Sequence, residues 1–300
     1  MAQLIKLYDY ISRYEWNMYR YPTQYIRLKQ DKWEKIYERW QEQGVEDRKP
    51  QEKNERGPKL KWFSKTKKKD MQENHQIEIP KTEQRLKQAF LDRLYRFQLK
   101  WASSTISDMS LIDEKIYEDE TLKYFLQRFP DNYFLLYYPV FAIKNAPIDG
   151  EIIFISPLGI EIIHLLETAT PYFYVAGDER FWIKEKNRKQ KHVLSPLIPL
   201  KRTEQIIKSI LKQADVDFPV QKVVLSETNH IICQAEPYQT RIIGKSDYPK
   251  WFEEKRVLSA PLKGQQLKAT EVILKHCQSL SFKRPEWEEE TDSFSFTDEV

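Results

Sequence analysis

The sequence predicts an α/β protein in which helices flank a mixed β-sheet and an all-helical N-terminal region comes first. Short apolar runs that are typical of strands crowd into residues 134–184. Apolar residues recur at three- and four-residue steps in residues 2–44 and 82–104, which indicates amphipathic helices. Helical patterns return at 201–214 and 264–280. This order of helix, several strands, helix and strand is typical of a mixed sheet with helices packed on it.

Residues 1–45 form the first predicted region, which is rich in tyrosine and tryptophan. The spacing of Leu4, Leu7 and the apolar residues after them predicts coiled-coil-like helix, broken near Pro22 and ended by Gly44. We interpret it as a helical hairpin that packs on the main domain or on a protein partner. An interfacial membrane helix is the alternative, and the acidic residues among its bases weigh against that alternative.

Residues 46–80 form the second predicted region, a flexible basic linker. Segment 48–69 holds ten Lys or Arg and two Glu, together with two prolines and one glycine. A solvated tether is the plain interpretation. The functional alternative is a patch that contacts nucleic-acid phosphates or an anionic membrane. The candidate nucleic-acid-binding residues are Lys61, Lys65, Lys67, Lys68 and Lys69.

Residues 81–110 hold one amphipathic helix, which Thr82 is placed to cap. The apolar stripe of this helix consists of Leu86, Phe90, Leu94, Phe97 and Trp101. A stripe of this kind is typical of a core-facing helix rather than of a cofactor site.

The α/β domain is predicted over 111–282, and a disordered acidic tail over 283–300. A helix capped by Asp113 runs to Arg128. The expected strands follow at 134–143, 151–155, 160–166, 172–175, 180–184 and 219–226. Pro139 indicates an edge strand or a bulge.

Composition excludes several classes of site. Seven glycines, no two within five residues of each other, leave no glycine-rich phosphate loop. Two cysteines and five histidines show no zinc-ligand spacing, and two thiols suit a reducing cytoplasm. No run approaches the roughly 18 apolar residues of a membrane span.

The stretch 118–167 carries the most information about function. A helix bearing Glu120 precedes a strand, Ile148-Asp149-Gly150 opens a second strand, and Ser-Pro-Leu-Gly turns into a third. This order resembles the nuclease-related domain (NERD) family, whose core is similar to the PD-(D/E)xK restriction-endonuclease fold. The resemblance covers about 115–230 and rests on short apolar strings.

The resemblance implies divalent-metal-dependent phosphodiester hydrolysis. In the family, two carboxylates gather the ion, and a lysine two residues after the second carboxylate stabilises charge on phosphorus. Glu120 and Asp149 match this pattern, whereas His164 and Leu166 stand where the family has Glu and Lys. Loss of one such stabilising group commonly lowers the rate by about two to three orders of magnitude.

Rescue by neighbouring residues is not expected. His164 can ligate Mn²⁺ or Zn²⁺ but suits Mg²⁺ poorly. Strand alternation sends Glu161 and Glu167 to the face opposite His164. Only tertiary geometry would bring Lys144 or Lys184 into the place of the missing lysine.

Each candidate also has a purely structural interpretation. Asp149-Gly150 is a hairpin signal, Glu120 is an ordinary helix charge, and His164 is a packed, hydrogen-bonded residue. We therefore expect a pseudoenzyme of the cytoplasm, a nuclease-type domain kept as a nucleic-acid- or protein-binding module without a cofactor. The first alternative is an active Mg²⁺- or Mn²⁺-dependent nuclease that uses Glu120, Asp149 and His164. The second is an interaction protein at a membrane surface.

Overall fold

The computed structural model describes residues 1–46, 82–143, 146–177 and 180–284. Contacts divide the chain into two compact units, one of residues 1–26 with 93–300 and one of residues 27–92. Most of the predicted basic linker, including its five candidate lysines, lies outside the described residues, as do Lys144 and the acidic residues of the tail.

A six-stranded sheet forms the centre of the larger unit and confirms the mixed α/β class. Its strand order is β1 (Gln3–Leu7), β3 (Phe134–Tyr137), β6 (Ile152–Ser156), β7 (Gly159–Leu165), β11 (Val220–Leu225) and β13 (Thr240–Ile243). Strand β6 is antiparallel to both of its neighbours, and the other adjacent pairs are parallel. Five strands therefore end at the same edge of the sheet.

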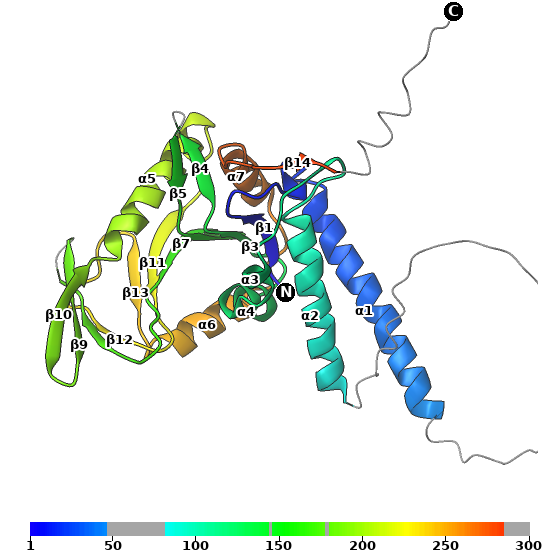
Figure 1. Ribbon diagram of the computed structural model, residues 1–300, viewed down its shortest axis with the longest axis horizontal. Helices are drawn as coiled ribbons and strands as arrows, with labels where there is room; N and C mark the ends of the chain where they lie inside the picture. The colour runs from blue at the N-terminus through cyan, green and yellow to red at the C-terminus, as the bar shows by residue number, and fades with distance from the viewer. Residues whose placement is uncertain (47–81, 144–145, 178–179, 285–300) are drawn as a thin grey trace, which may run out of the picture. The chain divides into compact units, whose positions relative to one another are not determined.

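Helices cover both faces of this sheet (Figure 1). One face, here called the α5 face, contacts α5 (Leu197–Gln213) and α7 (Gly264–Leu274). The opposite α4 face packs against α4 (Glu120–Arg128) and α6 (Tyr248–Val257), whose Leu122 and Trp251 join one apolar core. Alternate strand residues such as Ile152, Phe154 and Ile163 point into that core, so the intervening residues face α5.

The prediction of helix from residue 2 is wrong, because residues 3–7 form β1, a buried edge strand of the six-stranded sheet. All five residues are buried, and the strand pairs in parallel with β3. The spacing of Leu4 and Leu7 fits a helix as well as a fully buried strand, so periodicity alone does not separate the two. The helix instead begins at Tyr21, and Pro22 occupies its first turn, where proline is well tolerated.

Lys6 in β1 is fully buried with all three donors used. Its Nζ donates to Tyr10 O at 2.7 Å, Glu15 Oε1 at 2.7 Å and Ser279 Oγ at 2.5 Å. A buried ammonium is tolerated only when it is paired and hydrogen-bonded in this way. The bonds tie the first strand to a residue near the other end of the described chain.

Two further sequence expectations need correction. The single helix over 113–128 is α3 (Glu114–Tyr117) followed by α4, because Asp113 and Asp119 each cap a separate first turn. The strand over 134–143 breaks at Tyr138-Pro139 into β3 and β4 (Val140–Ile143), and β4 forms a separate hairpin with β5 (Ala146–Asp149). The shortest remaining elements are η1 (Arg13–Glu15), β2 (Asp108–Met109) and β14 (Phe282–Lys283).

A second sheet extends the larger unit. Its order is β10 (Lys189–Leu194), β9 (Phe181–Lys186), β8 (Phe173–Val175) and β12 (His230–Ile232). Trp182 of β9 is fully buried, whereas the residues of β10 are mostly exposed. The sheet thus has a buried aromatic residue in β9 and a solvent-exposed edge strand, β10.

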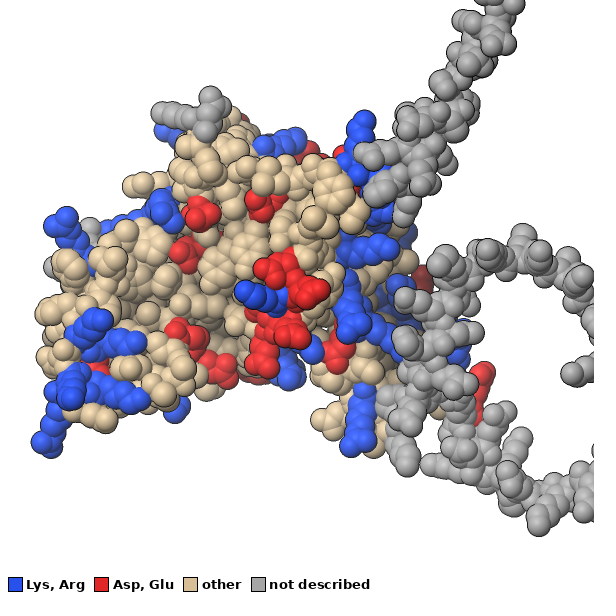
Figure 2. Space-filling view, viewed as in Figure 1, with Lys and Arg blue, Asp and Glu red and all other residues tan. Residues whose placement is uncertain are grey.

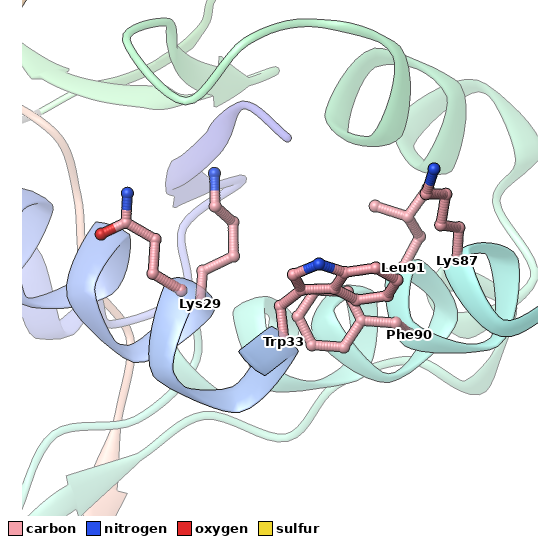
Figure 3. A pocket seen from close by; sticks show the side chains of 6 residues that line it. Lys29, Trp33, Lys87, Phe90 and Leu91 are labelled. Atoms are coloured by element: carbon pink, nitrogen blue, oxygen red, sulfur yellow. The ribbon is translucent and has the colours of Figure 1, made fainter. Parts of the chain in front are cut away.

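Within the smaller unit, parts of α1 (Tyr21–Glu46) and α2 (Glu83–Trp101) pack through aromatic rings. The centroids of Trp33 and Phe90 are 5.2 Å apart, and Trp33 also stacks on Tyr37 at 5.5 Å. A cavity of about 310 Å³ lies beside this contact, with Lys29 and Lys87 among its lining residues (Figure 3). The hairpin predicted within residues 1–45 is not formed, because α1 is one continuous helix and its partner α2 belongs to the next predicted region. Among the described helices, none combines the length and apolarity required to cross a bilayer.

A buried ion pair holds α5 on the sheet. Lys222 Nζ of β11 lies 2.6 Å from Glu204 Oε2 of α5, and the side chains are 6% and 11% exposed. Lys208, which is half-exposed, reaches the other carboxylate oxygen at 2.8 Å. Burial opposes ionisation of Glu204, but hydrogen bonds from Lys208 and Lys222 outweigh it and lower the pKa of the carboxyl.

We expect Glu204→Gln to lower the free energy of unfolding by about 3 kcal/mol, because it leaves the Lys222 ammonium buried without its partner. Lys208→Ala is the matched control and costs at most about 0.5 kcal/mol, since the Lys208 ammonium is half-exposed and leaves the Glu204–Lys222 pair intact. Glu204→Met combined with Lys222→Met recovers most of the loss. Urea unfolding measures all three variants.

The same pair predicts an acid-sensitive component of stability. The pKa of Glu204 is lower in the folded protein than its ordinary value of 4.5. Its contribution is therefore complete above that value and disappears as the pH falls through the lowered folded pKa. Unfolding curves of the Met/Met variant between pH 7 and pH 3 should lack this component, and an unchanged pH dependence would contradict the assignment.

Candidate functional site

Polar side chains gather at the sheet edge where the five parallel strands end. Strand β7 ends in His164 and Leu165, and the antiparallel β6 begins beside it, directly after Glu151. The register pairs Ile152 with Ile163, so the next step outward places Glu151 opposite His164. The two side chains meet, with His164 Nδ1 3.1 Å from Glu151 Oε2.

Both the backbone N–H and the side chain of Glu151 are hydrogen-bonded. Its N–H donates to Thr203 Oγ1 of α5 at 3.2 Å, and its side chain is 11% exposed. An ionised carboxylate only accepts, so His164 donates from Nδ1. The pair lies on the α5 face, because Ile163 and Leu165 belong to the core on the opposite face.

Glu120 lies on the other side of the sheet. As the first residue of α4 it lines a cavity of about 360 Å³ on the α4 face. The cavity also contains Glu167, Glu227 and the phenols of Tyr124 and Tyr248, whose oxygens are 2.8 Å apart. Glu120 therefore shares a cavity with other carboxylates and not with His164.

Asp149 lies apart from both of them. It ends β5, opposite Val140 in the β4–β5 hairpin, and its side chain is exposed. Its backbone oxygen accepts a hydrogen bond from the Arg202 guanidinium of α5 at 3.0 Å. Asp149-Gly150 connects β5 to β6, two strands that belong to different sheets, so the hairpin turn predicted for this dipeptide is not formed.

The structure does not bring Glu120, Asp149 and His164 together. Within the described ranges, no three His, Cys, Asp or Glu side chains are grouped to hold a metal ion. The residue that sequence reasoning missed is Glu151, which contacts His164. Counting back from the Ser-Pro-Leu-Gly turn along the antiparallel pair would have found it, because Ser156 pairs with Gly159 and the register continues without a break.

The expected alternation of β7 is confirmed at Glu161, which faces α6 and accepts from Lys255 Nζ at 2.5 Å. Leu166 follows the strand, and its N–H donates to Leu225 O at 2.9 Å. Lys184 does not fill the place of the missing lysine; its Nζ lies 3.8 Å from the centroid of the Tyr172 ring.

Tyrosines surround the carboxylates at this edge. Burial raises the pKa of Tyr138 to about 12, and the nearby charge of Glu151 adds to the effect. Burial likewise raises the pKa of Tyr137, whose hydroxyl donates to Asp119 Oδ2 at 2.9 Å. The phenols therefore stay protonated at neutral pH and act as neutral hydrogen-bond donors.

The surface around α3 and α4 is acidic. Figure 2 shows Asp and Glu side chains gathered near the centre of the view, where Figure 1 places these helices. The acidic residues in and beside α3 and α4 are Asp113, Glu114, Glu118, Asp119 and Glu120. Such a surface repels the phosphate groups of a nucleic acid.

The Glu151–His164 pair predicts a defined tautomer. Neutral His164 should carry its proton on Nδ1 in the native protein, and Glu151→Ala should move it to Nε2, the tautomer that a histidine side chain without such a partner prefers. Two-bond ¹H–¹⁵N NMR distinguishes the tautomers. His276, whose Nδ1 lies 2.9 Å from Val272 O, is the internal control and should not change. An unchanged His164 spectrum in the variant would contradict the pairing.

Comparison with known proteins gives one short similarity. No family model matches the chain, and no solved structure matches it. A stretch of 41 residues, 14% of this chain, is 56% identical to a Geobacillus stearothermophilus protein described as an RNA 2',3'-cyclic phosphodiesterase. The stretch spans 13% of that protein, so the chain covers only a small part of it.

Proposed function

We propose that the larger unit is a nuclease-type domain that binds nucleic acid and does not hydrolyse it. The separation of the candidate residues carries this proposal. Metal-assisted hydrolysis needs ligands that converge on one ion and a cation beside the phosphorus. Here Glu120 is on the α4 face, His164 is bonded to Glu151 on the α5 face, and an aliphatic residue follows at Leu166.

The partners of Glu151 and His164 add support. The imidazole uses Nδ1 in the bond to Glu151, and the backbone of Glu151 is bonded to α5 through Thr203. These groups contribute to the structure of the sheet edge.

The whole chain has a small excess of basic side chains, which is compatible with a nucleic-acid ligand. The sequence pI is about 8.7. The chain holds 49 Lys and Arg against 45 Asp and Glu, and the acidic side chains concentrate near α3 and α4 and in the last residues. The Geobacillus protein is described as an enzyme that acts on an RNA phosphodiester. That short similarity places RNA beside DNA among the ligands to be tested.

We expect the full chain to bind labelled 20-mer DNA and RNA in EDTA and to release no cleavage products in Mg²⁺ or Mn²⁺. Binding should weaken steeply as salt increases, because phosphate contacts release counterions. Fluorescence anisotropy measures binding, and denaturing gels measure cleavage on the same samples.

Cleavage that depends on the candidate site residues would favour the alternative of an active nuclease with a modified site. The decisive variants are Asp149→Ala, Glu151→Ala and His164→Ala, with Glu253→Ala as the exposed, matched carboxylate outside the site. Mn²⁺-dependent cleavage that any of the three variants abolishes and the control retains would overturn the proposal. Absence of any nucleic-acid binding at 50 mM salt would overturn it as well.

A further inference from the structure

The β9–β10 hairpin carries an unusual arrangement of lysines. Antiparallel register places Lys184 directly opposite Lys191 and Lys186 directly opposite Lys189. Residues two apart on a strand share a face, so all four lysines project from the same face of the second sheet. We call these four residues the lysine patch.

Cross-strand neighbours have Cβ atoms only about 5 Å apart, and like charges in that position destabilise a sheet. The described residues give none of the four lysines a carboxylate partner in an ion pair. Glu185 lies between Lys184 and Lys186 but points to the other face, where Gln190 donates to it at 2.9 Å. Among the described residues, these two opposed pairs of like charge therefore have no counter-charge.

Tyrosine rings contact two of the four lysines of the patch. The Nζ atoms of Lys184 and Lys186 lie 3.8 Å and 5.0 Å from the centroid of Tyr172, and Lys184 lies 5.7 Å from that of Tyr174. A ring face attracts a cation but does not neutralise it. Lys189 and Lys191 are exposed, with no ring contact among the described residues.

The turn that joins the two strands fixes the patch on a rigid element. Asn187 and Arg188 have φ angles of 51° and 61°, the left-handed values of a two-residue hairpin turn whose twist matches the strands. Arg188 adds a further exposed cation at the tip. Figure 2 shows the basic side chains gathered at the end of the molecule where Figure 1 places β9 and β10.

We propose that the lysine patch is a binding site for the phosphate backbone of a nucleic acid. The four ammonium groups form two cross-strand pairs on one face of the sheet, about 7 Å apart along the strands. This spacing suits repeated phosphates better than one isolated anion. The patch lies on the second sheet, away from the acidic surface of α3 and α4. This inference rests on the proposed function and specifies its contact surface.

The test compares two triple variants of equal charge change in the full chain. Lys186→Ala, Lys189→Ala and Lys191→Ala reduce the patch, while Lys212→Ala, Lys250→Ala and Lys268→Ala remove three exposed lysines elsewhere. The probes are a 20-base-pair DNA, a 20-nucleotide single-stranded RNA, and vesicles of phosphatidylcholine with phosphatidylserine. Binding is measured between 50 and 200 mM salt in EDTA.

We expect the patch variant to lose at least about tenfold in affinity at low salt and to reduce the salt slope for duplex DNA by about 2 to 3, because each phosphate contact contributes about 0.9. The control variant should change neither quantity. The thermal midpoint of the patch variant should stay the same or rise, since opposed like charges have been removed. This second measurement separates lost contact from lost folding.

Other outcomes show whether the lysine patch, the proposed function or both are wrong. Equal nucleic-acid binding by both variants, with loss only when Lys65, Lys67, Lys68 and Lys69 are changed to Ala, would overturn the patch and leave the proposed function intact. A wild-type protein that binds the vesicles and neither nucleic acid would overturn both. A patch variant that has lost its cooperative unfolding transition would also contradict the inference, because it assigns the lysines no role in folding.

Discussion

The register of the β6–β7 pair determines what the central sheet edge contains. With Ile152 opposite Ile163, alternate residues enter the core beneath α4, and Glu151 and His164 share the other face. A slip of one residue would reverse every side chain on the strand. It would place the His164 imidazole beside α4 and turn Glu161 away from α6 toward the α5 face. The apolar core thus fixes the composition of the site, and the polar residues occupy the positions that remain.

This constraint explains why a likeness in sequence order does not assemble a hydrolytic centre. Glu120 reaches the sheet edge from α4, whereas Asp149 belongs to a hairpin that the break at Tyr138-Pro139 separates from the central strands. The positive φ of Tyr138, 46°, turns the chain out of β3 at that point. Glu120 therefore lies on the α4 face, whereas Asp149 and the Glu151–His164 pair lie near α5. Charge follows the same division, with acids near α3 and α4 and lysines on the β9–β10 hairpin.

Local signals predicted much of the fold. The turn between β6 and β7, the cap of α3 by Asp113 and the stripe of α2 each depend on residues close together in sequence. Strand β1 was missed because its pairing partner, β3, lies more than a hundred residues away and because burial of Lys6 depends on Ser279. Asp149 was chosen over Glu151 because the Ile-Asp-Gly string fits the family pattern, while only the cross-strand count reveals which carboxylate meets His164.

Stability and function are connected through α5. Two consecutive residues of this helix hold it to the sheet: Thr203 accepts the N–H of Glu151, and Glu204 pairs with Lys222. A buried pair that loses one partner is strongly destabilising, so the helix has little freedom to move away from the α5 face. Moving Glu151 toward a metal ion would break its bonds to His164 and Thr203 and weaken this attachment. The same rigidity benefits a binding surface, because contacts on a fixed sheet require less ordering when a ligand arrives.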